Sequence, residues 1–106
     1  SDLKPLSIFS LGEHASPYSQ APGRFGAHQF HERLDTTLIY ATWFSGGLRI
    51  IDAKDPTLPE EVGFFIPEPL GGEPSPQSND VAVGEDGIIY LLDRNRGLHI
   101  LEFEGA

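Results

Sequence analysis

The residues best suited to chemistry stand close together in one stretch, RFGAHQFHE, residues 24–32. It contains Arg24, His28 and His31. A guanidinium binds a carboxylate or a phosphate through two parallel hydrogen bonds. An imidazole ligates metals and transfers protons near neutral pH. The stretch therefore predicts an anion-binding or catalytic role for these three side chains, against the structural alternatives of a salt bridge for Arg24 and a packed or hydrogen-bonded imidazole for His28.

The spacing of the two histidines restricts any metal site. In an extended segment, side chains three positions apart point to opposite faces. His28 and His31 would therefore not bind one ion together without a bulge. A divalent transition metal would instead take one histidine from each of several units that meet on an axis, and His28 would be this chain's ligand.

Five further residues are candidates for ligand binding, each with a structural alternative. Trp43 is the only tryptophan and stands beside a Gly-Gly turn, where its ring is either a stacking platform or part of the core. Asn79 and Asp80 begin an extended segment, and Asp80 would ligate a metal, orient a histidine or cap a turn. Arg94 and Asn95 occupy a turn, where local turn chemistry also accounts for them.

The composition excludes several classes of partner and site. The chain has 106 residues, 16 acidic against 7 Lys and Arg, and a net charge of −9. Nucleic acid and anionic membrane surfaces both require clustered positive charge, so neither is expected as a partner. No apolar run approaches the roughly 18 residues of a membrane span. The absence of cysteine rules out disulfides and thiol chemistry, and it fits an extracytoplasmic or a cytosolic protein.

A repeat determines where these residues lie. Residues 38–52, LIYATWFSGGLRIID, recur fifty positions later as residues 88–102, IIYLLDRNRGLHILE. The identical pairs are Ile39/Ile89, Tyr40/Tyr90, Gly47/Gly97, Leu48/Leu98 and Ile50/Ile100. A fixed period of this length is typical of stacked or radial repeat folds.

Each copy of the repeat predicts a meander of short strands. No window has the period of a helix, and 12 Gly and 9 Pro separate the apolar runs. We expect an all-β protein with one four-stranded antiparallel unit at residues 26–66 and a second at 78–103. Residues 1–10 predict an outer strand that completes the second unit. Four-stranded units of about 50 residues are the blades of β-propellers.

Three segments resemble the LVIVD-repeat β-propeller family. They are SNDVAV (residues 78–83), the run IIYLLDRNRGLHILE, and GLRIIDAKDPTLPEEVGFFIPE (residues 47–68). The resemblance covers residues 26–103, and this part of the chain is similar to the last two blades of longer members. It implies a propeller architecture. Many members are secreted or attached to the cell surface, so it also implies an extracytoplasmic location, secreted or periplasmic.

Two blades do not make a propeller, which closes with about four to eight. We therefore expect residues 1–106 to form a single propeller segment that is incomplete alone, namely a C-terminal fragment or a separate subunit of a larger propeller. Its partners would be the remaining blades, supplied either by a longer companion chain or by further copies of itself. In the second case residues 1–10 of one copy would complete the second unit of its neighbour, and about three or four copies would close the ring.

The propeller arrangement predicts the position of the site. Loops 12–25, 43–46, 70–80 and 93–96 would meet at one mouth of the central channel, where ligands bind on a rigid scaffold. The predicted function is a ligand- or partner-binding scaffold. The alternative is a metal-dependent or acid–base enzyme with His28 on the axis, completed by other blades. A purely structural surface protein is the third possibility. Ser78 occupies the position of His28 in the second unit, so the chain does not offer one histidine per unit.

Overall fold

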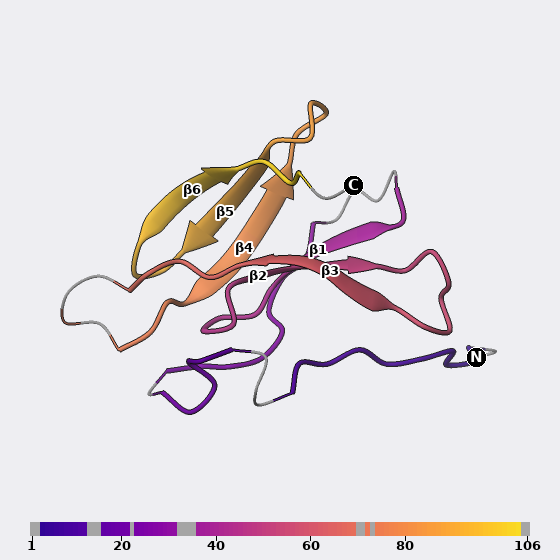
Figure 1. Ribbon diagram of the computed structural model, residues 1–106, viewed down its shortest axis with the longest axis horizontal. Helices are drawn as coiled ribbons and strands as arrows, with labels where there is room; N and C mark the ends of the chain where they lie inside the picture. Colours follow the sequence, from indigo (N-terminus) through magenta and orange to yellow (C-terminus); the bar gives the residue numbers. More distant parts are fainter. Residues whose placement is uncertain are drawn as a thin grey trace.

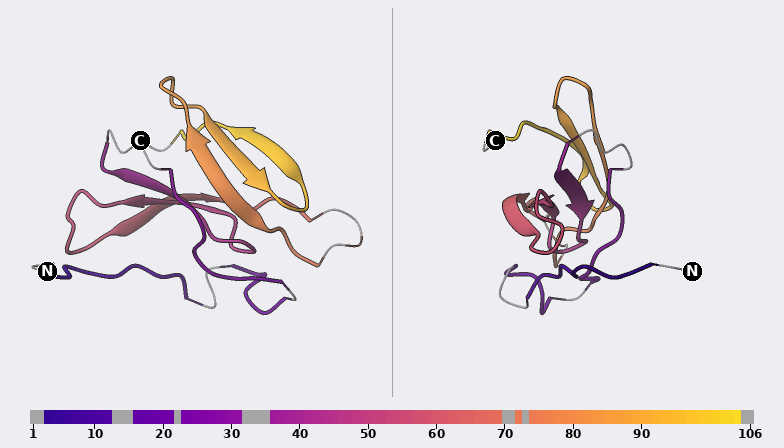
Figure 2. Two further views of the ribbon diagram at one scale, coloured as in Figure 1. Left: turned by 180° about the vertical axis from the view of Figure 1, so that it is seen from behind. Right: turned by 90° about the vertical axis from the view of Figure 1, so that its right-hand side faces the viewer.

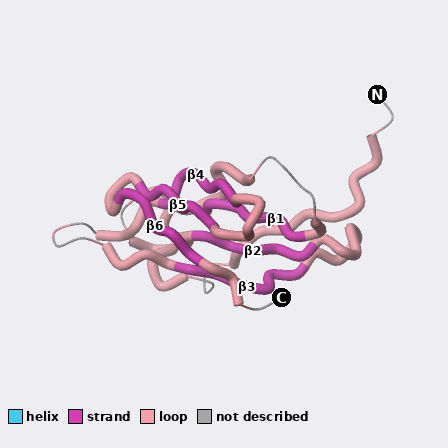
Figure 3. The backbone as a smooth tube through the Cα atoms, turned by 90° about the horizontal axis from the view of Figure 1, so that it is seen from above, coloured by secondary structure: helices cyan, strands magenta, loops and turns pink. Residues whose placement is uncertain are grey.

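The computed structural model of the chain describes residues 3–12, 16–21, 23–31, 36–69, 72 and 74–104. This part is all-β, as predicted, and Figures 1 and 3 show strands joined by loops. It contains no helix, and hence none that could cross a membrane. The strands are β1 (Leu38–Thr42), β2 (Leu48–Asp52), β3 (Glu60–Phe65), β4 (Ser78–Val83), β5 (Ile89–Asp93) and β6 (Gly97–Leu101). They form two separate three-stranded antiparallel sheets, ordered β1-β2-β3 and β4-β5-β6.

Glycine and aspartate determine the turns between the strands. Gly47, between β1 and β2, has φ +73°, and a Cβ there would collide with the carbonyl oxygen of Phe65. Between β2 and β3, the Asp55 carboxylate accepts hydrogen bonds from the backbone N and the hydroxyl of Thr57, at 3.0 and 2.6 Å. Such local bonds favour tight turns, and tight turns make sequence neighbours pair in antiparallel sheets.

The two sheets pack face to face around one apolar core, the junction core, which consists of Leu48, Ile50, Val81, Ile89 and Leu91. Figure 1 shows the second sheet lying over the first, and Figure 2 shows the same layers from behind. Burial of each such side chain stabilises the fold by about 1.5–3 kcal/mol. The junction core therefore contributes most of the apolar contact that joins the two sheets.

The opposite face of the first sheet is covered by the N-terminal segment. Ala41, Trp43 and Ile51 are buried there, and we call them the capped face. Phe9 and Leu11 pack on them, and the Phe9 ring meets the Trp43 ring edge-on at 6.1 Å. Figure 1 shows residues 3–12 running along the side of the first sheet that faces away from the second. The described part thus has three layers, namely second sheet, first sheet and N-terminal segment.

The inner segment of the first unit is paired but irregular. The backbone N of His28 donates to Thr42 O at 3.0 Å, Thr42 N donates to Gln29 O at 2.7 Å, and His31 N donates to Tyr40 O at 2.9 Å. The predicted fourth strand is therefore replaced by an irregular segment along β1. The ladder is interrupted because Gln29 N donates to the hydroxyl of Thr42, at 3.0 Å, and not to a backbone carbonyl. Strands β1–β3 lie within the predicted unit 26–66, and β4–β6 lie within 78–103.

The outer strand predicted over residues 1–10 does not form among the described residues 3–10. The Ser7 hydroxyl donates to Pro56 O at 2.7 Å, and Phe9 packs on Trp43. This segment therefore lies on the first sheet and does not complete the second. The physical reason is that an apolar face of the first sheet is available next to it, while Pro5 lacks the backbone donor of a regular ladder. Its pairing with β6 of a neighbouring copy stays a prediction.

Candidate functional site

Phe44 lies where the turn after β1 meets the start of β4. Its backbone N donates to Ser78 O at 2.9 Å, and Ser78 N donates to Phe44 O at 3.0 Å. This is an isolated bridge between the turn after β1 and the start of β4. Phe44 has φ +48°, which is uncommon for a residue with a side chain. The bridge and a hydrogen bond from Gly47 N to Phe44 O, at 3.0 Å, hold this conformation.

Three basic side chains surround the buried Phe44 ring. The guanidinium carbons of Arg24 and Arg94 lie 5.6 and 5.7 Å from the ring centre. The His28 ring centre lies 4.6 Å away, with an interplanar angle of 53°. Cation–π contacts at exposed sites contribute about 0.5–1 kcal/mol each. We call Arg24, His28, Phe44 and Arg94 the rim cluster; its three basic members are exposed.

A buried glutamine anchors the backbones of both arginines. Gln77 accepts from Arg24 N through Oε1, at 3.1 Å, and donates to Arg24 O through Nε2, at 3.2 Å. Its own carbonyl accepts from Arg94 N at 3.0 Å. Gly23, with φ +115°, leaves room for this side chain, because a Cβ there would lie 2.9 Å from the Gln77 Nε2. Sequence reasoning missed Gln77, since nothing in the Pro-rich loop around it distinguishes a buried anchor from a solvated side chain.

A buried carboxylate fixes the turn that presents the second arginine. Asp93 Oδ2 accepts from Gln77 N at 2.9 Å and from the Ser78 hydroxyl at 3.1 Å. Its Oδ1 accepts from the backbone N of Asn95 and of Arg96, at 2.9 and 3.1 Å. The Asn95 side chain donates to the backbone of the preceding loop, at Ser75 O, at 3.1 Å. Asn95 thus has the turn role that its position suggested.

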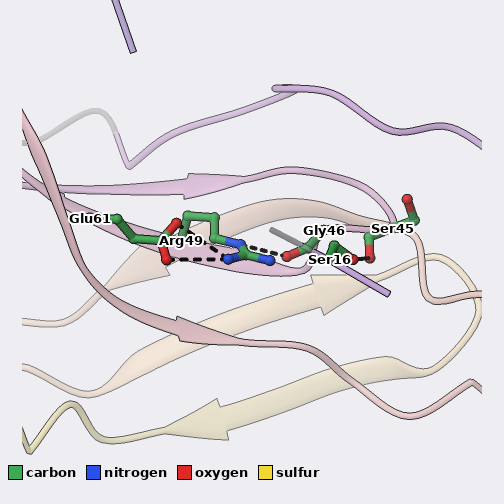
Figure 4. Close-up of polar contacts among 5 residues, drawn as sticks. All are labelled: Ser16, Ser45, Gly46, Arg49 and Glu61. Carbon is green, nitrogen blue, oxygen red and sulfur yellow. Dashed lines mark hydrogen bonds and ion pairs between the residues drawn. The ribbon is translucent and has the colours of Figure 1, made fainter. Parts of the chain in front are cut away.

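The two rim arginines have no acidic partner within the described part of the chain. The ion pair found there joins Arg49 and Glu61 at 3.3 Å. Figure 4 shows that Arg49 also donates through Nε to Gly46 O, at 2.9 Å. Beside it, the Ser16 hydroxyl donates to Ser45 O at 3.2 Å. Arg49 is fully buried in the first sheet and therefore has a structural role, in contrast to the exposed Arg24 and Arg94.

The two histidines connect the inner segment to β4 at separate points. His28 Nδ1 lies 2.7 Å from Asn79 O, and because a carbonyl only accepts, Nδ1 donates this bond, which in the neutral ring leaves the lone pair on Nε2. His31 Nδ1 accepts from Val83 N at 3.2 Å, so its proton lies on Nε2. The two rings therefore present opposite tautomers. Among the described residues, no group of three metal-ligating side chains comes together.

The other predicted residues lie outside the rim cluster. Trp43 is buried in the capped face, in the packing role. Asp80 is exposed and accepts from Val81 N at 2.9 Å. His31 lines a hollow of about 330 Å³ between the sheets, together with Thr36, Leu38, Tyr40, Val83, Gly84, Glu85 and Gly87. The structure thus brings together Arg24, His28 and Arg94. Asn79 contacts His28 through its backbone carbonyl, and Asn95 follows Arg94 in the same turn.

Comparison with known proteins adds no relative. No protein-family model matches the chain, and neither a curated protein nor a solved structure matches it. The chemistry of the rim cluster and the internal repeat are therefore the basis for a functional proposal.

Proposed function

We propose that this chain is a segment of a β-propeller that serves as a binding scaffold, with its ligand site at the rim cluster. The support for the architecture is the fifty-residue repeat together with two sheets that stack face to face. The support for the position is that Arg24, Phe44 and Arg94 come from three different loops that would share the channel mouth of a propeller. The resemblance to the LVIVD-repeat family also supports an extracytoplasmic place of work.

The ligand class is an oxyanion, a carboxylate or a phosphate. The observation that carries this proposal is that two exposed guanidinium groups lie over one aromatic ring with no carboxylate partner in the described part, although the chain has 16 acidic residues. Placing two like charges beside the same ring costs free energy, which an anion between them would offset. Guanidinium groups match the geometry of carboxylate and phosphate oxygens. The Phe44 ring holds each group by a cation–π contact.

Titration of the ¹⁵N-labelled chain with inorganic phosphate and with succinate tests the proposal. We expect the amide signals of Arg24, Phe44 and Arg94 to shift with either probe. Arg94→Gln should weaken binding about tenfold or more, since a hydrogen bond to a charged group contributes about 1.5–3 kcal/mol. Arg96→Gln is the matched control, because it removes the same charge from the same turn. Equal weakening by both variants would show a diffuse charge effect and contradict a specific site.

A metal-dependent or acid–base enzyme is the second candidate. One observation favours it: His28 Nδ1 donates to Asn79 O, so the neutral ring presents its lone pair at Nε2, which is how ligating and basic histidines are commonly oriented. The remaining ligands would come from other blades. Titration of the chain with Zn²⁺ should then give binding that His28→Gln abolishes and His99→Gln leaves unchanged. Zn²⁺ binding that is insensitive to His28 would remove this candidate.

A further inference from the structure

The repeat places identical residues in two different environments. Leu48 and Ile50 of the first sheet are 1% and 3% exposed in the junction core, whereas Leu98 and Ile100, at the equivalent positions of the second sheet, are 59% and 64% exposed. Cross-strand pairing of β5 with β6 brings these two residues beside two further exposed apolar side chains. We call the resulting surface the open face; it consists of Tyr90, Leu92, Leu98 and Ile100.

The first sheet shows what covers such a face. The side of the first sheet that carries Leu48 and Ile50 is covered by Ile89 and Leu91, which point from β5 toward the first sheet. The residues of the first sheet that correspond to Ile89 and Leu91 are Ile39 and Ala41, and these lie on and beside the capped face, on the other side of that sheet. Within the chain, one side of a sheet therefore packs on the opposite side of the next sheet, in a head-to-tail order.

We propose that the open face docks onto the capped face of a second copy of this chain, repeating the junction core between molecules. The repeat indicates which surface covers the open face. In the junction core, Leu48 and Ile50 pack on the side of the second sheet that carries Ile89. In the first sheet of another copy, the equivalent side carries Ile39. Contacts of this head-to-tail kind generate rings when the rotation closes. The open face also groups four exposed apolar side chains on two paired strands, whereas apolar residues exposed singly are normal on a monomer.

The N-terminal segment occupies the capped face in the single chain, and its contacts suit it to leave. Leu3 and Ile8 are almost fully exposed, and Ser7 contributes one hydrogen bond, to Pro56 O. β6 is an edge strand, with unpaired backbone groups along one side. Residues 3–10 come directly before the first repeat unit in the sequence, just as β3 comes directly before the second. Residues 3–10 therefore correspond to an outer strand such as β3. On docking, this segment moves from its own capped face to β6 of the neighbouring copy and adds a fourth strand there.

The docking proposal depends on one part of the proposed function, the stacking of repeated sheets, and it does not depend on the oxyanion site. Arg94→Gln therefore has to leave self-association unchanged while it weakens phosphate binding. Loss of self-association in Ile100→Lys has to leave phosphate binding at the rim cluster of the folded chain unchanged. The two proposals can thus fail separately.

Sedimentation velocity of the full chain over a range of concentrations tests the docking. The wild-type chain should associate, and Ile100→Lys on the open face should weaken association at least tenfold. Leu58→Lys is the matched control, because Leu58 is equally exposed but lies in the turn before β3, on neither face. A wild-type chain that stays monomeric, or equal effects of both variants, would overturn the proposal.

A mixing experiment determines the orientation. Ile39→Lys, beside the capped face, should also block association, and a mixture of Ile39→Lys with Ile100→Lys should form heterodimers through the one intact face of each. Self-association of Ile39→Lys alone would show that two open faces meet, and would overturn the head-to-tail arrangement. If Ile39→Lys does not fold, Phe9→Ser provides the same test, because loosening the N-terminal segment should strengthen head-to-tail association and leave an open-face dimer unchanged.

Discussion

The two sheets have the same apolar residues at equivalent positions but bury them to very different extents. Ile50 is 3% exposed in the first sheet and Ile100 is 64% exposed in the second. Residue type is identical, so the difference comes from the neighbours. Among the described residues, the first sheet has a layer on each side, whereas the second has one on the inner side only. The comparison teaches that the same residues form a junction in one sheet and an exposed surface in the other; in the docking proposed above, this surface is one half of a second junction.

The turns of the two sheets differ where the strands agree. After β1 the turn holds the aromatic pair Trp43 and Phe44, whereas the equivalent positions in the second sheet are Asp93, the last residue of β5, and Arg94. Both β5–β6 and β1–β2 close with a glycine of positive φ, yet one turn is built on a buried ring and the other on a buried carboxylate. The rim cluster contains one residue from each of these turns, Phe44 from the first and Arg94 from the second. Shared strands with divergent turns are expected when the strands form the scaffold and the loops carry the specificity.

The largest expected effect concerns the pair Ile50 and Ile100. In dilute, monomeric protein, Ile50→Ala should lower the free energy of unfolding by about 2–5 kcal/mol, because it leaves a cavity in the junction core. Ile100→Ala should change it by less than about 0.5 kcal/mol, because the side chain is exposed. Urea denaturation followed by Trp43 fluorescence measures both.

Concentration sharpens this comparison. If the open face is covered in the associated state, the cost of Ile100→Ala should grow toward that of Ile50→Ala as the protein concentration rises. Equal costs of the two variants in the monomer would contradict the different burial of the two positions. A cost of Ile100→Ala that is independent of concentration would contradict docking through this residue.

A smaller difference is expected between Gly47 and Gly97. Both have positive φ, +73° and +93°, so alanine adds backbone strain of about 1–2 kcal/mol at either position. At Gly47 the new Cβ would also collide with Phe65 O and lie 2.9 Å from Ile66 Cα, whereas at Gly97 it meets nothing within 4 Å. Thermal unfolding followed by circular dichroism should therefore show a clearly larger loss for Gly47→Ala. Equal losses would mean that strain alone determines both turns.

The smallest effect concerns acid. The hydroxyl and backbone N of Thr57 both donate to Asp55 and hold the pKa of this carboxyl below its ordinary value of 3.8. Since the folded pKa is depressed, the stabilisation is present above pH 3.8 and is lost as the pH falls through the folded value. A titration of the Asp55 carboxyl by NMR should show the depressed pKa, and Thr57→Val should return it toward 3.8. An unchanged pKa in Thr57→Val would contradict the side-chain hydrogen bond as the main cause.

Local patterns predicted the strands well. The repeated runs 38–52 and 88–102 were expected to contain short strands, and they hold β1 with β2 and β5 with β6. These elements follow from short apolar runs and from Gly and Asp in the turns. The outer strand over residues 1–10 could not be placed, because β-propensity does not determine which edge or face a segment meets.

The basic members of the rim cluster were singled out in the sequence, but their assembly was not predicted. Arg24, His28 and Arg94 were identified by residue type, whereas their meeting over Phe44 depends on a bridge to Ser78 that is distant in the sequence. No local pattern indicates that Phe44 adopts φ +48° or that Gln77 turns inward. Long-range contacts of this kind leave no periodic signal in a single chain.

Native mass spectrometry of the full chain tests the central claim most directly, namely that the second sheet carries one half of a junction. In the proposed propeller architecture about four to eight blades close the ring and this chain would supply two, so we expect an assembly of about three or four copies. Ile100→Lys should reduce that assembly to single chains, and Leu58→Lys should leave it intact. A wild-type chain that stays folded and monomeric at every concentration would contradict the claim.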